Sequence, residues 1–220
     1  MRFRSREHAA RLLAERLSPD YKDKDPLVLG IPRGALPMAE IIADALGGEL
    51  DVVLVHKLSH PDQPELAIGA IDESGNVYLA EWANQMAPEV LEVEKQRQLN
   101  VLRRRRAQYT PLRPPIDPRG RNVLVVDDGI ATGSTMIAAL RAVRARKPKK
   151  LVCAVAVASP EAARALSHEA DELVCLLVPA EFFAVGQFFK DFAQVTDDHV
   201  VAILQRRQAP AAVTDRPREC

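Results

Sequence analysis

The amino-acid sequence predicts an α/β fold in which helices flank a mainly parallel, twisted sheet. Apolar runs of strand length alternate along the chain with segments whose apolar residues recur at helical spacing, and this alternation is typical of a parallel sheet covered by helices. The chain has 220 residues, of which 47% are hydrophobic, which is enough for a substantial core in one domain. We therefore expect one domain over 1–208 and a flexible tail over 209–220, with two smaller domains as an alternative.

The order of the expected elements follows the change from strand pattern to helix pattern along the chain. KLSHPDQPE, over 57–65, holds two prolines and no apolar period, so we expect an exposed, mobile loop there. TPLRPPIDPRG, over 110–120, is proline-rich and is expected to be a surface connector. In chain order we expect helix 5–17, strand 27–31, helix 35–46, strand 51–56, strands near 66–72 and 76–80, a long helix near 87–108, strand 122–127, helix 134–146, strand 150–157, helix 160–168, strand 172–177 and helix 198–207.

Individual elements have their own local signals. Helix 5–17 is charged, and it lacks the uninterrupted apolar stretch of a signal peptide. The long helix near 87–108 has its acidic residues early and a run of arginines, Arg103 to Arg106, late, as the helix dipole favours. The strands at 150–157 and 172–177 are apolar runs that each hold one cysteine, so both are expected to be buried.

The overall charge of the chain argues against a polyanionic partner. Lys plus Arg and Asp plus Glu are equal at 30 each, so no global field draws the protein to nucleic acid or to an acidic membrane. The arginine run could contact RNA, but aromatic residues are not interleaved with it. No apolar window has the length of a membrane span. Cys153, Cys175 and Cys220 form no close-spaced set, which favours reduced thiols in a cytoplasmic protein.

The stretch VLVVDDGIATGST, over 123–135, changes from an apolar strand to adjacent carboxylates and then to small and hydroxyl residues. Asp127 and Asp128 are expected at the carboxyl edge of a parallel strand, where an open sheet presents its ligand crevice. Two carboxylates at this edge can bind neighbouring hydroxyls of a sugar, or hold a divalent cation through water.

The residues after the acids are suited to binding a phosphate. Gly133 permits a tight turn, and the hydroxyls of Thr132, Ser134 and Thr135 lie at the start of an expected helix. The amides and the dipole at a helix N-terminus form a ready phosphate site. Ribose 5-phosphate would fit the whole motif, because its hydroxyls suit the acidic pair and its phosphate suits the turn. The structural alternative is that these residues only cap the helix. Competing phosphate motifs, G-x-x-x-x-G-K-S/T and G-x-G-x-x-G after a strand, are absent from the sequence.

Along its whole length, VLVVDDGIATGST resembles the phosphoribosyl pyrophosphate (PRPP) binding motif of type I phosphoribosyltransferases. The resemblance implies that family's fold, with a small hood and a mobile loop beside the parallel sheet. It also implies that Asp127 and Asp128 bind the ribose hydroxyls and take part in catalysis. The 5′-phosphate would be bound by Ala131, Thr132, Gly133, Ser134 and Thr135.

A second family element is expected after the first core strand. VLGIPRGALPMAEII supplies a strand, the loop Pro32-Arg33-Gly34 and a helix, and the resemblance implies that Arg33 and Gly34 contact the pyrophosphate of PRPP. By the same analogy the Pro32–Arg33 peptide bond is expected to be cis, which is rare when the second residue is not proline. An ordinary strand-to-helix turn with an exposed arginine is the alternative.

The family's mobile loop is expected within HKLSHPDQPELAIGAID, which begins at His56. The resemblance implies that Lys57, near the start of this stretch, binds pyrophosphate and takes part in catalysis. His56, His60 and Glu65 could also take part, or they could be solvated polar residues of the loop.

The family's hood is expected over 178–196, together with N-terminal residues. VCLLVPAEFFAVGQFFKDFAQV holds several phenylalanines after a strand, and these could form an aromatic shelf for a flat base. Phe182 and Phe183 are the candidates for acceptor binding, although such a cluster could equally belong to the core. LVPAEFFAVGQFFKDFAQVTDDHV and ELAIGAIDESG together resemble an uncharacterised bacterial subgroup of the family.

The resemblance implies an enzyme that transfers ribose 5-phosphate from PRPP to a small nitrogenous acceptor and releases pyrophosphate. Mg²⁺ is the implied cofactor, held by PRPP and by Asp127 and Asp128, with no metal site made by the protein alone. Relatives that act on 6-oxopurines have an aspartate just before the Thr-Gly turn, where this chain has Ala131, so a 6-oxopurine acceptor is not expected. By analogy with family members a homodimer is possible, whereas the expectation of no nucleic-acid or membrane partner follows from the balanced charge and the lack of a membrane span.

Two other functions are left open by the residues. A non-catalytic PRPP or nucleotide sensor on the same fold would need a second functional surface, such as a DNA-binding module, and we expect no segment of this chain to supply one. A sugar-phosphate hydrolase would need an activated water or nucleophile, which the sequence does not reveal.

Overall fold

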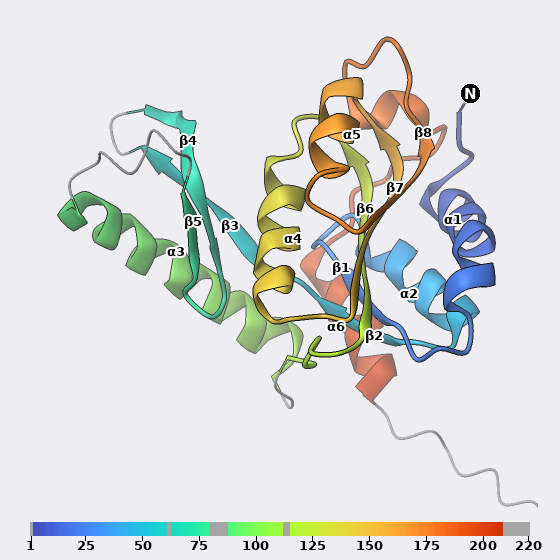
Figure 1. Ribbon diagram of the computed structural model, residues 1–220, viewed down its shortest axis with the longest axis horizontal. Coiled ribbons are helices and arrows are strands. Elements are labelled where there is room, and N and C mark those ends of the chain that lie inside the picture. Colours follow the sequence, from blue (N-terminus) through green and yellow to red (C-terminus); the bar gives the residue numbers. More distant parts are fainter. Residues whose placement is uncertain (1, 61–62, 80–87, 112–114, 209–220) are drawn as a thin grey trace, which may run out of the picture.

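The computed structural model describes residues 2–60, 63–79, 88–111 and 115–208, which form a parallel sheet, a smaller antiparallel sheet and the helices around them (Figure 1). The strands of the parallel sheet are β1 (Leu27–Gly30), β2 (Glu49–Val52), β6 (Asn122–Ile130), β7 (Lys150–Ala158) and β8 (Glu172–Leu177). Their order across the sheet is β2-β1-β6-β7-β8, and all neighbours run parallel. The predicted α/β class is therefore confirmed.

Helices cover both faces of the parallel sheet. In Figure 1, the first two helices lie on one face, and the fourth and fifth lie on the other. The third helix lies beside the antiparallel sheet, away from both faces. The helices are α1 (Arg6–Tyr21), α2 (Leu36–Leu46), α3 (Pro88–Tyr109), α4 (Ser134–Ala145), α5 (Pro160–Leu166) and α6 (Asp197–Gln208).

Alternation of side chains along the strands produces two hydrophobic cores, one on each face of the sheet. Leu124 and Val126 of β6 pack in the core that contains α1 and α2. Val123 and Val125 of the same strand pack in the core that contains α4 and α5. Because β6 is buried on both faces, its sequence is a continuous apolar run up to the acidic pair, as is typical of parallel sheets.

The chain leaves the parallel sheet in opposite directions after β1 and after β6. β1 connects through α2 to β2 on one side, and β6 connects through α4 to β7 on the other. The carboxyl ends of β1 and β6 therefore mark the switch point at which open α/β sheets bind ligands. β1 pairs with β6 only as far as Gly30, opposite Val126. β6 continues beside β7 to Ile130, opposite Ala158.

The acidic pair lies inside β6 and not at its end, which corrects the expected strand 122–127. Asp127 pairs with Val155 of β7, so hydrogen bonds to one neighbour keep β6 extended beyond the point at which β1 ends. On the other edge, the loop after β1 begins here, and the Ile31 amide donates to the carbonyl of Val126 at 3.1 Å. This loop is therefore held next to the acids.

The antiparallel sheet and α3 form a separate layer beside α4, on the left in Figure 1. We call α3 and the strands β3 (Val55–His60), β4 (Gln63–Asp72) and β5 (Val77–Leu79) the wing. The expected single strand over 51–56 is wrong, because its residues divide between β2 and β3, which belong to different sheets. The apolar run continues without a break from β2 into the start of β3, because Val52, Val53 and Leu54 are all buried. The sequence pattern therefore gives no sign that one strand ends and another begins.

The exposed loop expected over 57–65 is also wrong, because β3 and β4 pair there. Ser59 lies opposite Ala67 and His60 lies opposite Gln63, so the residues between Gln63 and Ala67 bulge out of the ladder. A proline is tolerated where a ladder is interrupted, and Pro64 occupies this bulge. Pairing with a distant segment thus overrides the local loop signal.

A buried ion-pair cluster fixes the wing to the parallel sheet. Arg106 of α3 donates from Nη1 to Asp51 Oδ1 at 2.9 Å and from Nε to Glu73 Oε2 at 2.6 Å. Its Nη2 also donates to the carbonyl of Val52 at 3.1 Å. Asp51 is 1% exposed and accepts the Ile116 amide at 2.9 Å as well. The cluster therefore joins α3, the β4–β5 turn and β2.

The N-terminal residues lie against the segment that was expected to form the hood. The Phe3 amide donates to the carbonyl of Phe188 at 2.8 Å, and the Phe3 carbonyl accepts the Lys190 amide at 2.9 Å. The rings of Phe3 and Phe189 are 5.4 Å apart between centroids. These contacts bring the start of α1 next to this segment. The assignment of a hood and of one domain stays a prediction, and the expected tail lies outside the described residues.

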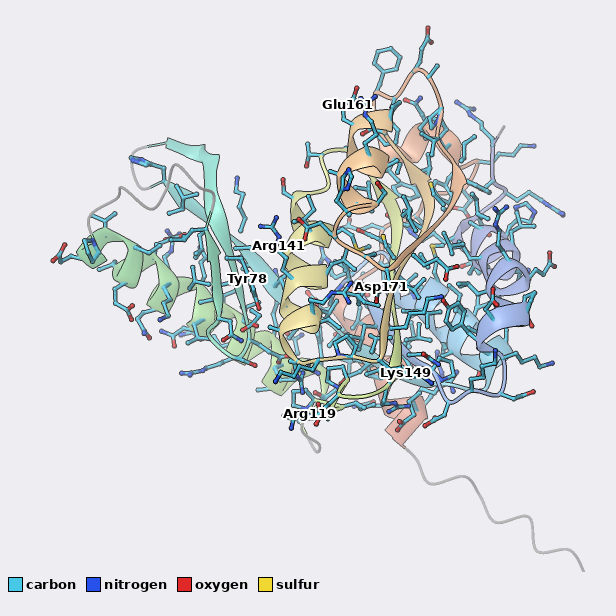
Figure 2. The ribbon with its side chains drawn as sticks, viewed as in Figure 1. Tyr78, Arg119, Arg141, Lys149, Glu161 and Asp171 are labelled. Carbon is cyan, nitrogen blue, oxygen red and sulfur yellow. The ribbon has the colours of Figure 1, made fainter. Side chains whose placement is uncertain are left out.

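Ion pairs join α4 to the segment that leads into β8 (Figure 2). Arg141 Nε donates to both carboxylate oxygens of Glu169 at 3.0 Å, and Arg144 Nη2 donates to Asp171 Oδ1 at 2.7 Å. Asp171 also accepts the Leu151 amide at 2.7 Å. These contacts hold the C-terminal half of α4 against the parallel sheet.

The described part of the chain bears on two expectations from the sequence, the lack of a membrane span and the reduced state of the cysteines. None of its helices combines the length and the apolar character needed to cross a membrane. Cys153 of β7 and Cys175 of β8 are free thiols, and Cys220 lies outside the described residues.

Replacing Arg106 by methionine should destabilise the fold by about 3–5 kcal/mol, because the buried charge of Asp51 and the half-buried charge of Glu73 would lose their partner. The measurement is the free energy of unfolding from urea titration. Arg104→Ala is the matched control, since Arg104 is an exposed arginine on the same helix and its loss should change stability by less than about 0.5 kcal/mol. Equal stabilities of the two variants would contradict the anchoring role of Arg106.

Candidate active site

A cavity of about 600 Å³ opens at the switch point between β1 and β6, and we call it the acid cavity. Asp127 and Asp128 line it together with Thr135 of the first turn of α4. Thr135 is the one residue of the expected phosphate turn over 131–135 that lines this cavity with the acids. Other lining residues come from α1, the loop after β1, α3 and the expected hood, and they include Arg6, Arg33, Gly34, Arg105, Phe192 and Gln194.

A second cavity, of about 390 Å³, lies between the wing and α4, and we call it the wing cavity. Pro32, Arg105 and Thr135 line both cavities, so the two spaces adjoin. The wing contributes His56, Lys57 and Gln98 to its lining, and α4 contributes Ser134. A ligand that binds at the acids could therefore extend toward the wing.

Asp128 forms an ion pair with Arg6 of α1 inside the acid cavity. Arg6 Nε lies 2.7 Å from Asp128 Oδ2, and both side chains are nearly buried. Arg6 Nη1 also donates to the carbonyl of Ala193 at 2.6 Å, and the guanidinium lies 3.8 Å from the centroid of the Phe192 ring. A Cβ atom on Gly34 would overlap Asp128 Oδ2, so glycine is needed where the loop after β1 passes the acid.

Asp127 has no comparable compensation for its charge. Its Oδ1 accepts the Asp128 amide at 2.8 Å, but no basic side chain of the described residues forms an ion pair with it. Burial, and then the neighbouring charge of Asp128, raise the pKa of Asp127 well above its usual range. Burial also raises the pKa of Asp128, although Arg6 opposes this rise. The pair is therefore costly to ionise in the absence of a ligand.

The turn after the acids has the geometry of an anion site. Gly133 adopts a left-handed conformation, with φ of 84°, which favours glycine. No side chain caps α4, so the amides of its first turn lack partners within the helix. The Ser159 hydroxyl fixes the turn by donating to the carbonyl of Ala131 at 2.7 Å. Ser134 and Thr135 line the cavities, whereas Ala131, Thr132 and Gly133 do not.

The loop after β1 contains the expected cis peptide bond between Pro32 and Arg33, which confirms that prediction. Arg33 Nη1 lies 3.5 Å from Asp197 Oδ2 at the start of α6. Asp197 also accepts the hydroxyl of Tyr109, and burial together with this contact raises the pKa of Tyr109. Asp197 thereby links the loop to the C-terminal end of α3.

The candidates on the wing lie mainly on β3. Lys57 and His56 both line the wing cavity. Burial lowers the pKa of His56, and Gln98 of α3 opposes this shift, so burial favours the neutral imidazole. His60 does not line either cavity, and the side chain of Glu65 lies outside what the structure describes.

The aromatic candidates for acceptor binding require correction. Phe182 packs against Phe188, with ring centroids 5.3 Å apart, and Phe183 is 84% exposed. Neither lines either cavity, whereas Phe192 lines the acid cavity. Packing of Phe182 on the core therefore removes it from the site, and the sequence did not distinguish it from Phe192.

Sequence reasoning also missed Arg6 and Arg105, although the helix pattern holds a signal for both. Arg6 shares a helix face with the buried residues Ala10 and Leu13, and Arg105 shares one with Leu102. A charged residue within an apolar stripe faces the protein interior or a cavity. Each arginine could have been singled out on this basis.

Comparison with known proteins shows which family the chain matches. A family model described as "Phosphoribosyl transferase domain" matches residues 4–191, which include the loop after β1, the acidic pair and the turn that follows. The match covers most of the chain.

The chain is also similar to individual proteins. "Putative phosphoribosyl transferase Rv0571c" from Mycobacterium tuberculosis is 42% identical over 207 residues, covering 93% of this chain and 46% of that protein. The chain thus spans about half the length of the curated relatives that it matches. The crystal structure of TT1426 from Thermus thermophilus has 49% identity and a TM-score of 0.85, covering 94% of this chain and 99% of that one.

Replacing Asp127 by asparagine should stabilise the fold at neutral pH, because it removes a poorly compensated charge. Burial raises the pKa of Asp127 in the folded protein above its unfolded value of about 4. Ionisation therefore costs no stability below about pH 4, and the cost accumulates as pH rises to the folded pKa. The Tm advantage of Asp127→Asn should grow over the same window, by about 2–4 °C per kcal/mol.

Differential scanning calorimetry at a series of pH values measures this difference. Asp20→Asn is the matched control, since Asp20 is exposed and its replacement should give a small Tm change that varies little with pH. A lower Tm of Asp127→Asn at every pH would contradict the expected cost, and it would favour a structural role for the carboxylate.

Proposed function

The chain belongs to the phosphoribosyl transferase family, and from this membership we propose that it transfers ribose 5-phosphate from PRPP to a nitrogenous acceptor and releases pyrophosphate. The observation that most supports the proposal is the acid cavity, in which Asp127, Asp128 and Thr135 line one space. Its volume of about 600 Å³ is typical of small-molecule sites.

Asp127 and Asp128 would accept hydrogen bonds from the ribose 2′ and 3′ hydroxyls. A carboxylate offers about four lone-pair sites, and the Arg6 side chain occupies Oδ2 of Asp128, so a sugar hydroxyl need not displace the ion pair. Hydroxyl donors would also offset the burial and repulsion that raise the pKa of Asp127. Ligand binding would thereby lower the cost of keeping the two carboxylates side by side.

The 5′-phosphate would be bound by the turn over 131–135 and by the first amides of α4. These amides lack helical partners, and the helix dipole adds a favourable partial charge. Ala131, Thr132 and Gly133 line neither cavity, so we propose that they act through their backbone amides. The Thr132 hydroxyl would act beside Ser134, which lines the wing cavity, because Thr132 Oγ1 and Ser134 Oγ are 3.5 Å apart.

Arg33, Gly34 and Lys57 would contact the pyrophosphate of PRPP. Arg33 and Gly34 line the acid cavity, and Lys57 lines the wing cavity. Because the two cavities adjoin, a pyrophosphate on C1 of the ribose can extend from the acids toward the wing. The absence of a side chain on Gly34 lets the backbone approach this group.

Transfer requires that the C1–oxygen bond of PRPP breaks while the acceptor nitrogen approaches C1 from the opposite face. The ribose ring gains positive charge in this step, and the carboxylates of Asp127 and Asp128 would stabilise it from the cavity wall. No covalent bond to the protein is needed, so positioning of the reactants supplies much of the rate enhancement. Each reduction of the barrier by about 1.4 kcal/mol increases the rate about tenfold.

Mg²⁺ is the cofactor that this chemistry implies. Among the described residues, no group of three His, Cys, Asp or Glu side chains could form a dedicated metal site. A cation beside Asp127 would favour its ionised form and so oppose the burial that raises its pKa. We infer that PRPP oxygens hold the ion together with Asp127 and Asp128. When bound, Mg²⁺ neutralises charge on the leaving pyrophosphate.

The acceptor is proposed to be a planar nitrogenous compound other than a 6-oxopurine. Ala131 has no side chain that could accept the proton of a 6-oxopurine ring. Phe192 and Gln194 line the acid cavity. Arg6 and Phe189 lie against the Phe192 ring, so Phe192 would offer only the ring atoms that they leave uncovered, and Gln194 offers an amide with both donor and acceptor atoms. They replace Phe182 and Phe183 as the proposed acceptor contacts.

A pyrophosphate-release assay tests the proposed transfer. Purified protein mixed with PRPP, Mg²⁺ and a panel of nitrogenous bases and amines should release pyrophosphate with at least one acceptor, but not with hypoxanthine or guanine. With the active acceptor, Asp127→Asn should lower kcat/KM by about 10²-fold or more, because a carboxylate beside the developing charge is lost.

The exposed variant Asp20→Asn should retain the unchanged protein's rate in the same assay. Binding of PRPP without release across a wide panel would contradict transferase activity. Robust turnover of hypoxanthine or guanine would instead contradict the expectation that is based on Ala131.

A further inference from the structure

Arg105 lines both the acid cavity and the wing cavity. Its neighbours on α3 behave differently. Arg106 belongs to the buried anchor with Asp51, and Arg103 and Arg104 are exposed and line neither cavity. The four arginines of the run therefore have different surroundings, and Arg105 is the one that lines the proposed substrate site.

The position of Arg105 on α3 explains why it reaches the cavities. Gln98, Leu102, Arg105 and Tyr109 follow one another at helical spacing and share one face of α3. The other three side chains of this face are buried. Arg105 remains exposed because the helix face borders the two cavities at this point. Part of the exposed surface of Arg105 therefore lines the two cavities.

Contacts of the residues that follow Arg105 hold this part of α3 in place. Arg106 binds Asp51 at 2.9 Å, and Tyr109 donates to Asp197, one turn further along the helix. No carboxylate of the described residues forms an ion pair with Arg105. A guanidinium on a fixed helix, beside a cavity and without a carboxylate partner, is suited to binding a phosphate group with paired hydrogen bonds.

The charge of Arg105 acts on groups around both cavities. After the larger effect of burial, Arg105 lowers the pKa of His56, which lines the wing cavity. Burial raises the pKa of Tyr109, and Arg105 opposes that rise together with Arg33. Its field therefore covers the region between Lys57 and the loop after β1, where the pyrophosphate is expected.

We propose that Arg105 binds the pyrophosphate group of PRPP and stabilises the charge that this group gains as it leaves. The inference rests on the proposed function. A pyrophosphate on C1 would begin beside Asp127 and Asp128 and extend toward Lys57, and Arg105 lines the junction between these positions. When the C1–oxygen bond breaks, its electron pair stays on the pyrophosphate oxygen. The acceptor nitrogen supplies the pair for the new C1–nitrogen bond and releases its proton to water.

Calorimetric titration with three ligands tests the proposal, with Mg²⁺ present and ionic strength held constant. The ligands are PRPP, pyrophosphate and ribose 5-phosphate, which lacks the pyrophosphate group. Arg105→Ala should weaken binding of PRPP and of pyrophosphate by on the order of 10- to 100-fold, as expected for the loss of charge-assisted hydrogen bonds. Its affinity for ribose 5-phosphate should stay unchanged, which also shows that the variant is folded.

Two further variants complete the design. Arg104→Ala, the matched control on the outer face of α3, should bind all three ligands as the unchanged protein does. Arg105→Lys keeps the charge but not the paired donors, so its PRPP affinity should lie between those of the unchanged protein and Arg105→Ala.

The outcomes separate this inference from the proposed function. If the unchanged protein binds PRPP and Arg105→Ala binds it equally well, the role of Arg105 is wrong and the proposed function stands. An equal loss for PRPP and ribose 5-phosphate would also overturn the role of Arg105, because it would show a general effect on the site. If the unchanged protein does not bind PRPP, the proposed function fails and the inference fails with it.

Discussion

Two adjacent carboxylates, half-buried Asp127 and buried Asp128, have to be kept at an open strand edge, and the rest of the site is arranged around this constraint. Asp127 and Asp128 lie on β6 just beyond the last residue that pairs with β1. Arg6 compensates one of them at 2.7 Å, and the loop after β1 passes close by because Gly34 has no side chain. The other carboxylate keeps a raised pKa because of burial. Its charge is left for hydroxyl groups or a cation to stabilise.

Most of the parallel sheet could be predicted from the sequence, because its signals are local. Apolar runs bounded by turns correspond to β1, β7 and β8 within a few residues. The wing could not be predicted in the same way. The division of 51–56 between β2 and β3 depends on which strand each half pairs with, and the β3–β4 pairing accommodates Pro64 in a bulge. Neither feature has a signal within a short window of sequence.

In the candidate site too, the proximity of residues that are close in sequence could be predicted, whereas the proximity of residues from distant segments could not. The acids and the turn over 131–135 form one motif, so their proximity follows from the chain itself. Arg6, Arg105 and Phe192 are brought to the acid cavity from three distant segments. Both arginines occupy inward helix faces, which is a detectable signal, whereas nothing in the composition distinguishes Phe192 from the other phenylalanines nearby. The resulting cavity is built jointly by the parallel sheet, the wing and the segment after β8, and the buried Arg106 cluster fixes the wing in place.

A crystal structure of the protein soaked with PRPP and Mg²⁺ would locate each part of the ligand relative to the acids and α4. We expect the ribose hydroxyls about 2.5–3.0 Å from the carboxylate oxygens of Asp127 and Asp128, with the 5′-phosphate on the first turn of α4. Ribose bound away from these carboxylates, or a phosphate that does not contact the α4 turn, would show that the acids and the turn do not form one binding site.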